Sequence, residues 1–256
     1  MDTTELRQHL IKVPAITALF WITKIFATTF GETGGDAISM SMNLGYLVST
    51  FIFAAIFIVL LYFQIQAKSY KSYLYWATII ASTTVGTTLA DFVDRSLGIG
   101  YLGGTLILIG LVLVSLFSWY KVEGTINPHS VNQPRAEIFY WLTITFSQTL
   151  GTALGDWASD SAGLGYIGGM VLFSSLIVLM ALLYYFSSVS RTLLFWTTFV
   201  LTRPLGAVVG DFLDKPLSSG GLDLSRFAAS FVLLIAILIC IYWSTCQDKY
   251  QNKSIQ

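Results

Sequence analysis

The sequence predicts an all-α, polytopic membrane protein with eight transmembrane helices, arranged as four parallel helical-hairpin repeats. Two observations carry this prediction: an apolar composition and a motif that occurs four times. Of the 256 residues, 55% are hydrophobic and only 11% are charged, and the mean hydropathy is +0.70. Because about a quarter of the residues of soluble domains are charged, this composition favours a chain that lies in a bilayer.

Eight apolar segments follow one another along the chain. Each is about 20 residues long, the length that a helix needs to cross a hydrocarbon core. Polar joints separate the segments, and no joint is long enough to fold as a soluble domain. The segments cover 14–35, 45–65, 73–91, 100–120, 137–156, 165–186, 192–212 and 226–244. They divide the chain into an N-terminal segment (1–13), four repeats (14–71, 72–122, 137–190 and 191–246), a linker (123–136) and a tail (247–256).

Basic residues are unevenly distributed between the two sides of the predicted membrane. Nine fall on the side of the termini: Arg7, Lys12, Lys68, Lys71, Lys121, Arg135, Arg191, Lys249 and Lys253. Five fall on the other side or in the segments that lead to it: Lys24, Arg95, Arg203, Lys215 and Arg226. The positive-inside rule therefore predicts that both termini, and with them the N-terminal segment, the linker and the tail, are cytoplasmic. The expected location is the bacterial cytoplasmic (inner) membrane.

A motif with fixed spacing occurs four times, which indicates an internal repeat. Its tryptophans are Trp21, Trp76, Trp141 and Trp196. A glycine follows ten residues later, at Gly31, Gly86, Gly151 and Gly206, and an aspartate five residues after that, at Asp36, Asp91, Asp156 and Asp211. Nine residues further on is a second glycine, at Gly45, Gly100, Gly165 and Gly220. Since each repeat holds two predicted spans, all four copies run in the same direction, which disfavours an inverted-repeat transporter.

These tryptophans and Gly-x4-Asp motifs resemble a bacterial membrane-protein family that consists of four tandem copies of a repeat of unknown function. In that family each copy has two transmembrane segments and a characteristic tryptophan. The resemblance covers the chain from about Pro14 to Trp243. It implies an integral membrane protein with eight segments and brings no substrate with it. The fourth copy departs from the pattern, with Gly221 and Leu222 where the other copies have tyrosine and with Pro204 before its glycine.

The first helix of every repeat carries a polar stripe, and the second helix does not. Residues four apart lie on one face of a helix, so stepping back in fours from each motif aspartate identifies that face. The residues on it are Lys24, Thr28 and Glu32 in the first repeat; Ile79, Thr83 and Thr87 in the second; Ile144, Gln148 and Thr152 in the third; and Phe199, Arg203 and Ala207 in the fourth. The second helices hold no charge over 47–63, 102–119, 167–185 and 227–243. A charge at the bilayer centre costs at least ~2.5–3.5 kcal/mol. We therefore expect the odd-numbered helices inside and the even-numbered helices outside.

The charges on the striped faces predict a cation site. Five carboxylates, from Glu32, Asp36, Asp91, Asp156 and Asp211, converge with only two basic groups, Lys24 and Arg203. Like charges on one axis need protons or a bound cation, and oxygen ligands suit Mg, Ca or Mn.

Specific roles follow from this hypothesis. Asp91 and Asp156 are the expected metal ligands. Glu32 is the expected proton acceptor, and Lys24 or Arg203 is the internal counter-charge. The remaining polar groups of the predicted route are Asp36, Asp211, Thr87, Thr152 and Gln148.

Structural explanations compete with this hypothesis. The aspartates lie near the outer ends of their helices, where they can terminate or cap a helix; in that case Asp94 and Asp214 are solvated, and Arg95 and Lys215 are their surface partners. A static salt bridge, Lys24 with Glu32 or Arg203 with an adjacent repeat's aspartate, explains the deeper charges. The motif tryptophans suit an aromatic belt or simple packing, and the belt interpretation extends to Trp119 and Trp243.

The function predicted from these features is transport of a small cation, with a divalent ion and proton coupling as the favoured variants. The alternative is a membrane scaffold or sensor whose buried charges are structural. An enzyme is disfavoured because no Ser-His-Asp set, paired histidines or phosphate-binding loop is found. The expected partners are the lipid bilayer and a small cation or proton. Neither nucleic acid nor a cofactor is predicted, and the oligomeric state is left open.

Overall fold

The protein is described from a computed structural model that covers residues 12–254, with side chains described as far as residue 247. Nearly all of the predicted N-terminal segment, including Arg7, lies outside the described residues, as do the side chains of Lys249 and Lys253 in the predicted tail.

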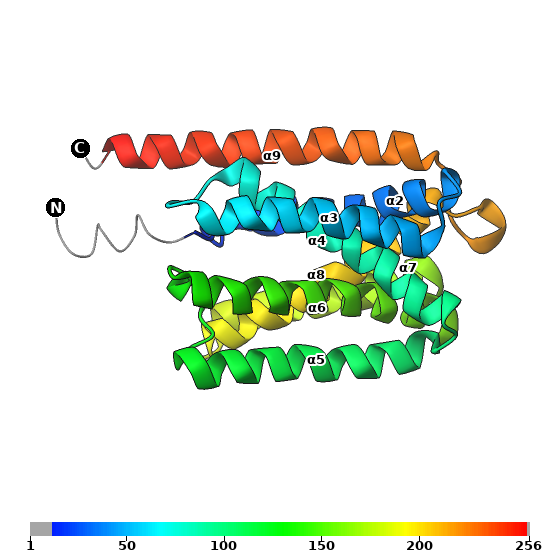
Figure 1. The fold of residues 1–256 in the computed structure, drawn as a ribbon, viewed down its shortest axis with the longest axis horizontal. Helices are drawn as coiled ribbons and strands as arrows, with labels where there is room; N and C mark the ends of the chain where they lie inside the picture. The colour runs from blue at the N-terminus through cyan, green and yellow to red at the C-terminus, as the bar shows by residue number, and fades with distance from the viewer. Residues whose placement is uncertain (1–11, 255–256) are drawn as a thin grey trace.

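Eight long helices make up almost all of the described chain, which confirms the all-α prediction (Figure 1). The first helices of the four repeats are α2 (Ala18–Asp36), α4 (Ser72–Asp91), α6 (Pro134–Asp156) and α8 (Arg191–Asp214). The second helices are α3 (Gly45–Gln66), α5 (Gly100–Glu123), α7 (Gly165–Phe186) and α9 (Arg226–Ser254). The described chain begins and ends at the same end of the bundle (Figure 1).

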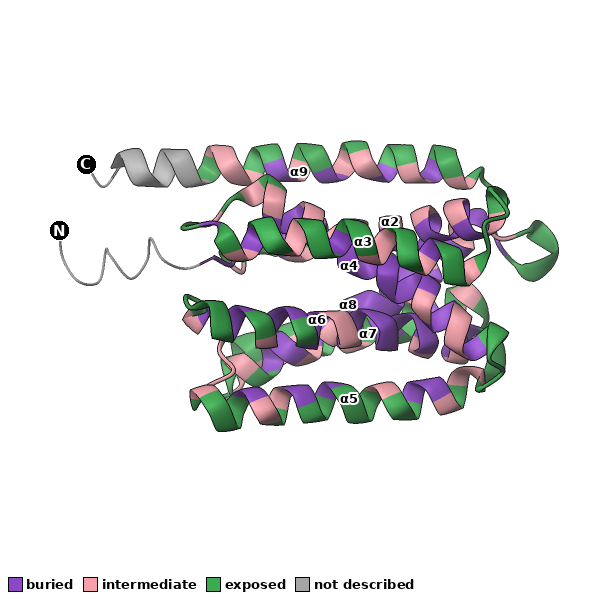
Figure 2. Ribbon diagram, in the orientation of Figure 1, coloured by how far each residue is buried: buried purple, intermediate pink, exposed green. Residues whose placement is uncertain are grey.

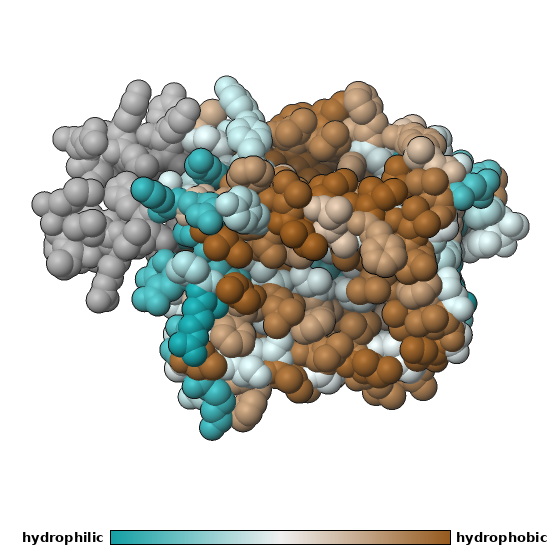
Figure 3. Space-filling view, in the orientation of Figure 1, coloured by the Kyte–Doolittle hydropathy of each residue, from teal (hydrophilic) through white to brown (hydrophobic). Residues whose placement is uncertain are grey.

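Five of these helices are long and apolar enough to cross a membrane: α3, α5, α7, α8, and α9 as far as Gln247. The other three, α2, α4 and α6, have 19, 20 and 23 residues, but their threonines and charges make them more polar. Figure 3 shows apolar side chains over the middle of the visible face and hydrophilic ones gathered towards its ends.

The four first helices form the interior and the four second helices surround it, as the polar stripes predicted. In Figure 2 buried residues concentrate on α4, α6 and α8, whereas α3, α5 and α9 expose most of their outward faces. The exposed side chains of the outer helices are apolar, for example Phe51, Leu113, Val171 and Phe231. Lipid is the solvent that such a surface requires.

The helices of one repeat do not pack together as the predicted hairpin. Each outer helix packs instead on the inner helix of the next repeat: α3 on α4, α5 on α6, α7 on α8, and α9 back on α2. The inner helices also contact each other in cyclic order, α2 with α4, α4 with α6, α6 with α8 and α8 with α2. The repeats therefore form a closed ring in which every repeat covers its neighbour.

The turns between inner and outer helices explain why the second motif position is a glycine. The helices α2, α4 and α6 end at their motif aspartates, and a five-residue π-helical turn follows each of them, at Ala37–Ser41, Phe92–Ser96 and Trp157–Ser161. Gly45, Gly100 and Gly165 then begin the outer helices with φ of 72°, 76° and 63°. This left-handed conformation favours glycine.

The fourth repeat differs at this turn. The helix α8 continues past Asp211 to Asp214, and a short 3-10 turn, Leu217–Ser219, leads towards α9. Gly220 ends that turn with φ of 85°. Pro216 precedes the turn and has no backbone N–H to donate to a helix. The chain therefore turns here through the 3-10 segment and not through a π-helical turn.

Candidate functional site

The four inner helices interlock through the first motif glycine. Each glycine lies against the residue that stands eight positions before the aspartate of the neighbouring repeat: Gly31 against Thr83, Gly86 against Gln148, Gly151 against Arg203, and Gly206 against Thr28. A Cβ atom on Gly206 would lie 2.2 Å from Thr28 Oγ1 and 2.9 Å from its backbone carbon. The glycine thus lets adjacent helices approach closely, and the same contact closes the ring between the fourth and first repeats.

Arg203 occupies the centre of the ring and contacts all three other repeats. Its Nη2 atom lies 2.9 Å from Glu32 Oε2, 2.5 Å from Thr87 Oγ1 and 2.5 Å from Thr152 Oγ1. The residue is completely buried. The structure therefore brings four of the predicted site residues into one contact group and places a guanidinium on the axis. The sequence hypothesis of a static bridge paired Arg203 with an aspartate, but its acidic partner is Glu32.

Lys24 lies one turn from this group without a polar partner. Its side chain is completely buried, and within the described residues its Nζ atom has neither a hydrogen bond nor an ion pair. The nitrogen lies 3.7 Å from the centroid of the Phe199 ring, a cation–π contact. The predicted pairing of Lys24 with Glu32 is therefore wrong. Gln148 is also completely buried, and neither amide atom of its side chain has a hydrogen-bond partner in the described part of the chain.

The motif aspartates form two pairs, and each pair is held by one basic side chain. Arg95 places Nε 3.0 Å from Asp91 Oδ1 and Nη2 3.3 Å from Asp156 Oδ2. Lys215 places Nζ 2.5 Å from Asp36 Oδ2 and 3.1 Å from Asp211 Oδ1. Each pair joins two adjacent repeats, so the ring of four aspartates has approximate two-fold symmetry.

Asp214 and Asp94 are buried beside these pairs, although the capping hypothesis expected them to be solvated. Asp214 Oδ2 accepts a hydrogen bond from Arg226 Nε at 3.0 Å. The carboxylate of Asp94 lies against Gly104, where a Cβ would meet Oδ1 at 2.0 Å. Burial raises the pKa of Asp94 to about 6, although Arg95 opposes this shift.

The environment of Lys215 stabilises its charged form. Burial lowers the pKa of this amine, but the surrounding carboxylates of Asp211, Asp36 and Asp214 outweigh burial and hold it well above its usual value. Lys215 and Arg95 are the functional residues that sequence reasoning missed, since they were expected to be surface partners of Asp214 and Asp94. Both stand four residues after a motif aspartate, and this spacing, which lets two side chains meet on a helix, is the signal that was available.

Counting all the charged groups named above changes the predicted balance only a little. Seven carboxylates (those of Glu32, the four motif aspartates, Asp94 and Asp214) face five basic groups (Lys24, Arg95, Arg203, Lys215 and Arg226), so the formal excess of negative charge falls from three to two. The expectation that Asp91 and Asp156 bind a cation stays a prediction. Arg95 lies between them and already supplies one positive charge.

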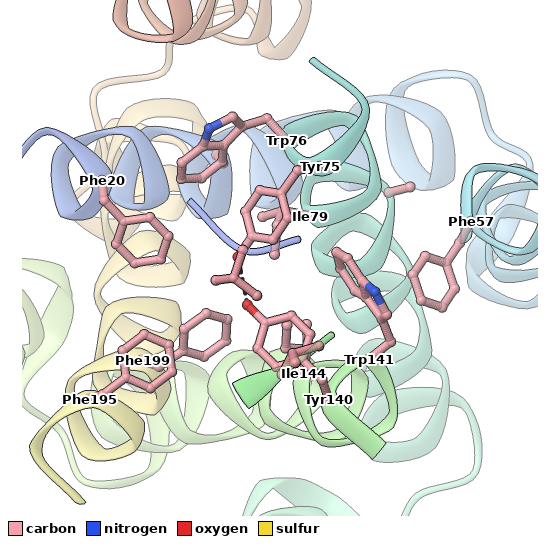
Figure 4. Packing of buried hydrophobic residues seen from close by; sticks show 14 of the residues in the cluster. Phe20, Phe57, Tyr75, Trp76, Ile79, Tyr140, Trp141, Ile144, Phe195 and Phe199 are labelled. Atoms are coloured by element: carbon pink, nitrogen blue, oxygen red, sulfur yellow. Dashed lines mark hydrogen bonds between the residues drawn. The ribbon is translucent and has the colours of Figure 1, made fainter. Parts of the chain in front are cut away.

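An aromatic layer closes the opposite end of the axis. Figure 4 shows Phe20, Tyr75, Tyr140 and Phe199 directed from four different helices towards a common centre, with a hydrogen bond of 2.7 Å between the two tyrosine hydroxyls. The motif tryptophans Trp76, Trp141 and Trp196 belong to the same buried cluster, so their role is packing. Trp119 is completely buried and stacks edge-on against Trp196, which corrects its assignment to an aromatic belt, whereas Trp243 is exposed.

The repeat in the sequence coincides with a known family. Four segments, at 19–70, 74–125, 139–190 and 194–250, match the family described as Repeat of Unknown Function (DUF347). Neither a curated protein nor a solved structure is significantly similar to the chain. Because the four matches cover most of its length, the chain belongs to the DUF347 repeat family.

Proposed function

We propose that the protein is an integral membrane transporter for a small cation, coupled to protons, and that the polar axis between α2, α4, α6 and α8 is its transport route. Lys24 is the observation that carries the proposal. A structural ion pair accounts for Glu32 and Arg203. Lys24, in contrast, is completely buried, and among the described residues its amine has an aromatic contact but neither a hydrogen bond nor an ion pair, so no opposite charge offsets the cost of burying it. Ionisable groups at membrane depth are retained mainly for function.

The two ends of the axis support an occluded state of such a transporter. The aromatic layer lies at one end and the aspartate pairs with Arg95 and Lys215 lie at the other. Between them the groups are polar, and several lack hydrogen-bond partners among the described residues, including Thr83 Oγ1 and Arg203 Nη1. An alternating-access cycle requires two barriers of this kind around a polar centre.

The proposal includes eight membrane crossings with both termini in the cytoplasm of a bacterium. The polar helices α2, α4 and α6 need not be apolar, because the outer helices shield them from lipid. The joints after α3, α5 and α7 lie at the same end as the two ends of the described chain (Figure 1). They carry Lys68, Lys71, Lys121, Arg135 and Arg191, which supports the cytoplasmic assignment.

Flux of Mn²⁺ into proteoliposomes under two imposed pH gradients tests this function. The wild-type flux should follow the gradient, and it should fall to background in Asp156→Asn and in Lys24→Met. The matched control is Glu123→Gln, which removes a carboxylate of a partly exposed pair at the end of α5, 3.6 Å from Arg135. All variants must remain monodisperse. Equal flux in the wild type and both axis variants would contradict the proposed route.

A scaffold or sensor is the second candidate, because every motif aspartate has a basic partner. On that account well-folded wild-type protein moves neither Mn²⁺, Mg²⁺ nor Na⁺. Asp156→Asn then changes only the free energy of unfolding. This outcome would reject cation transport and leave the ion pairs as devices that fix the helix register.

A further inference from the structure

We infer that Asp36, Asp211 and Asp214 form a binding site for a divalent cation, and that Lys215 is a tethered competitor for it. This inference deepens the proposed function and rests on it, because the bound cation would be the transported ion. It assigns the cation ligands to the half of the ring that holds Lys215 instead of to the Asp91–Asp156 pair.

The three carboxylates have the geometry of a ligand set. One oxygen from each lies within 4.8 Å of those from the other two, and all three residues are buried. Asp36 ends α2, whereas Asp211 and Asp214 are three residues apart on α8 and so share a helical face. Two helices from different repeats therefore deliver hard oxygen ligands, which Mg²⁺, Ca²⁺ and Mn²⁺ prefer.

Lys215 shows that a cation is favoured at this place. Its ammonium lies 2.5, 3.1 and 4.0 Å from oxygens of Asp36, Asp211 and Asp214. Asp36 Oδ1 is buried and has neither a hydrogen bond nor an ion pair in the described part of the chain. The buried Oδ1 atoms of Asp211 and Asp214 have no hydrogen bond there either, and they face Lys215 as ion-pair contacts. Three negative charges face Lys215 and Arg226, so a divalent ion that displaces the ammonium would be better matched in charge than the ammonium itself.

The corresponding place in the other half of the ring differs in two respects. Only two carboxylates, Asp91 and Asp156, meet there, because Asp94 is directed at Gly104. Arg95 spans them with two separate nitrogens of a planar, permanently charged group. Lysine presents a compact charge on a flexible stem, and it is the side chain that can leave. Only the Lys215 half is thus arranged for exchange.

Mn²⁺ binding to the purified full-length protein in detergent tests the site, with the free ion measured by electron paramagnetic resonance. Lys215→Gln removes the competitor and should bind one Mn²⁺ at least about tenfold more tightly than the wild type, given the strength of a nearby like charge. Arg95→Gln is the matched control, since it removes one positive charge from the corresponding position of the other half. It should show no gain. Asp214→Asn added to Lys215→Gln should abolish the gain, and Mg²⁺ should compete with Mn²⁺.

The wild-type chain provides a second test if Lys215→Gln does not fold. Mn²⁺ at millimolar concentration should raise its unfolding temperature by mass action, and this rise should vanish in Asp214→Asn. An unchanged affinity in folded Lys215→Gln, an equal gain in Arg95→Gln, or no rise for the wild type would overturn the inference. Binding is measured at equilibrium without a gradient. If the protein does not bind Mn²⁺ at this site but still transports it, the site is rejected and the proposed function stands. If the protein binds Mn²⁺ at this site but does not transport it, the proposed function is rejected and the site stands.

Discussion

Arg203 reaches the axis because its own helix leaves room for it. One turn beyond Arg203 the fourth repeat has Ala207, where the other repeats have Glu32, Thr87 and Thr152. The guanidinium takes the space of the missing side chain and bonds to the three groups that the other repeats supply at this level. An asymmetric substitution within a symmetric repeat thereby creates a single central group.

Breaking the central pair should be costly. Arg203→Met leaves Glu32 buried without its basic partner, and we expect the free energy of unfolding in a denaturing detergent titration to fall by about 3–5 kcal/mol. The double variant with Glu32→Leu should lose less than the sum of the two single variants. Removing the partly exposed pair of Arg135 and Glu123 should change stability by about 0–1 kcal/mol. Additive single losses would show that the two residues are not coupled.

Gly206 makes the contact that closes the ring, and alanine does not fit there. We expect Gly206→Ala to lower the free energy of unfolding by about 1–3 kcal/mol or more, because its Cβ would collide with the side chain and backbone of Thr28. The control is Gly110→Ala on α5, where nothing lies within 4 Å of the new atom. Thermal unfolding followed by tryptophan fluorescence distinguishes them, and equal stability of the two variants would contradict the close packing.

At the level of elements, the inner and outer helices differ in polarity because their surroundings differ. The inner helices face mostly protein, and their buried threonine hydroxyls donate hydrogen bonds to the backbone of their own helix, as Thr84 does to Ile80 and Thr149 to Thr145. The outer helices pair their central backbone groups within the helix and present apolar side chains outwards, as lipid requires. Gly104 and Gly169 let two outer helices approach Asp94 and Val208 closely.

A charge at the middle of an outer helix should interfere with insertion. Leu113→Lys on α5 places an ammonium on an exposed apolar surface and should cost about 2.5–3.5 kcal/mol in the bilayer. Val122→Lys, beside Lys121 at the end of the same helix, should be tolerated because the side chain can extend to the interface. The fraction of expressed protein recovered folded from membranes measures the difference. Equal recovery would show that this face of α5 is not lipid-exposed.

At the level of the whole molecule, the four repeats pack as a closed ring. The swapped packing of each outer helix on the next inner helix means that α9 covers α2, and the last repeat completes the first. Every inner helix is covered on one side by a neighbour's outer helix, which is why a bundle with so many buried charges can present an apolar surface along the outer helices.

Eight crossings predict a definite labelling pattern for single cysteines. In a chain without Cys240 and Cys246, Ser218→Cys between α8 and α9 should react with a membrane-impermeant maleimide on intact cells. Ser69→Cys and Ser188→Cys, which follow α3 and α7, should react only after permeabilisation. All three positions are exposed, so accessibility of the side chain is not the variable. Labelling of Ser69→Cys on intact cells would reject the proposed orientation.

The sequence by itself determined the all-α class, the four repeats, the inner and outer helices and most of the polar groups at the axis. These features depend on hydropathy and on spacing along one helix, which a linear pattern records. Only the tertiary structure decided which repeat each outer helix covers, that Lys24 has no polar partner among the described residues, and that Arg95 and Lys215 bridge aspartates of two repeats. Those contacts join residues far apart in the chain, for example Asp36 and Lys215, and no periodicity along the sequence encodes how a ring closes.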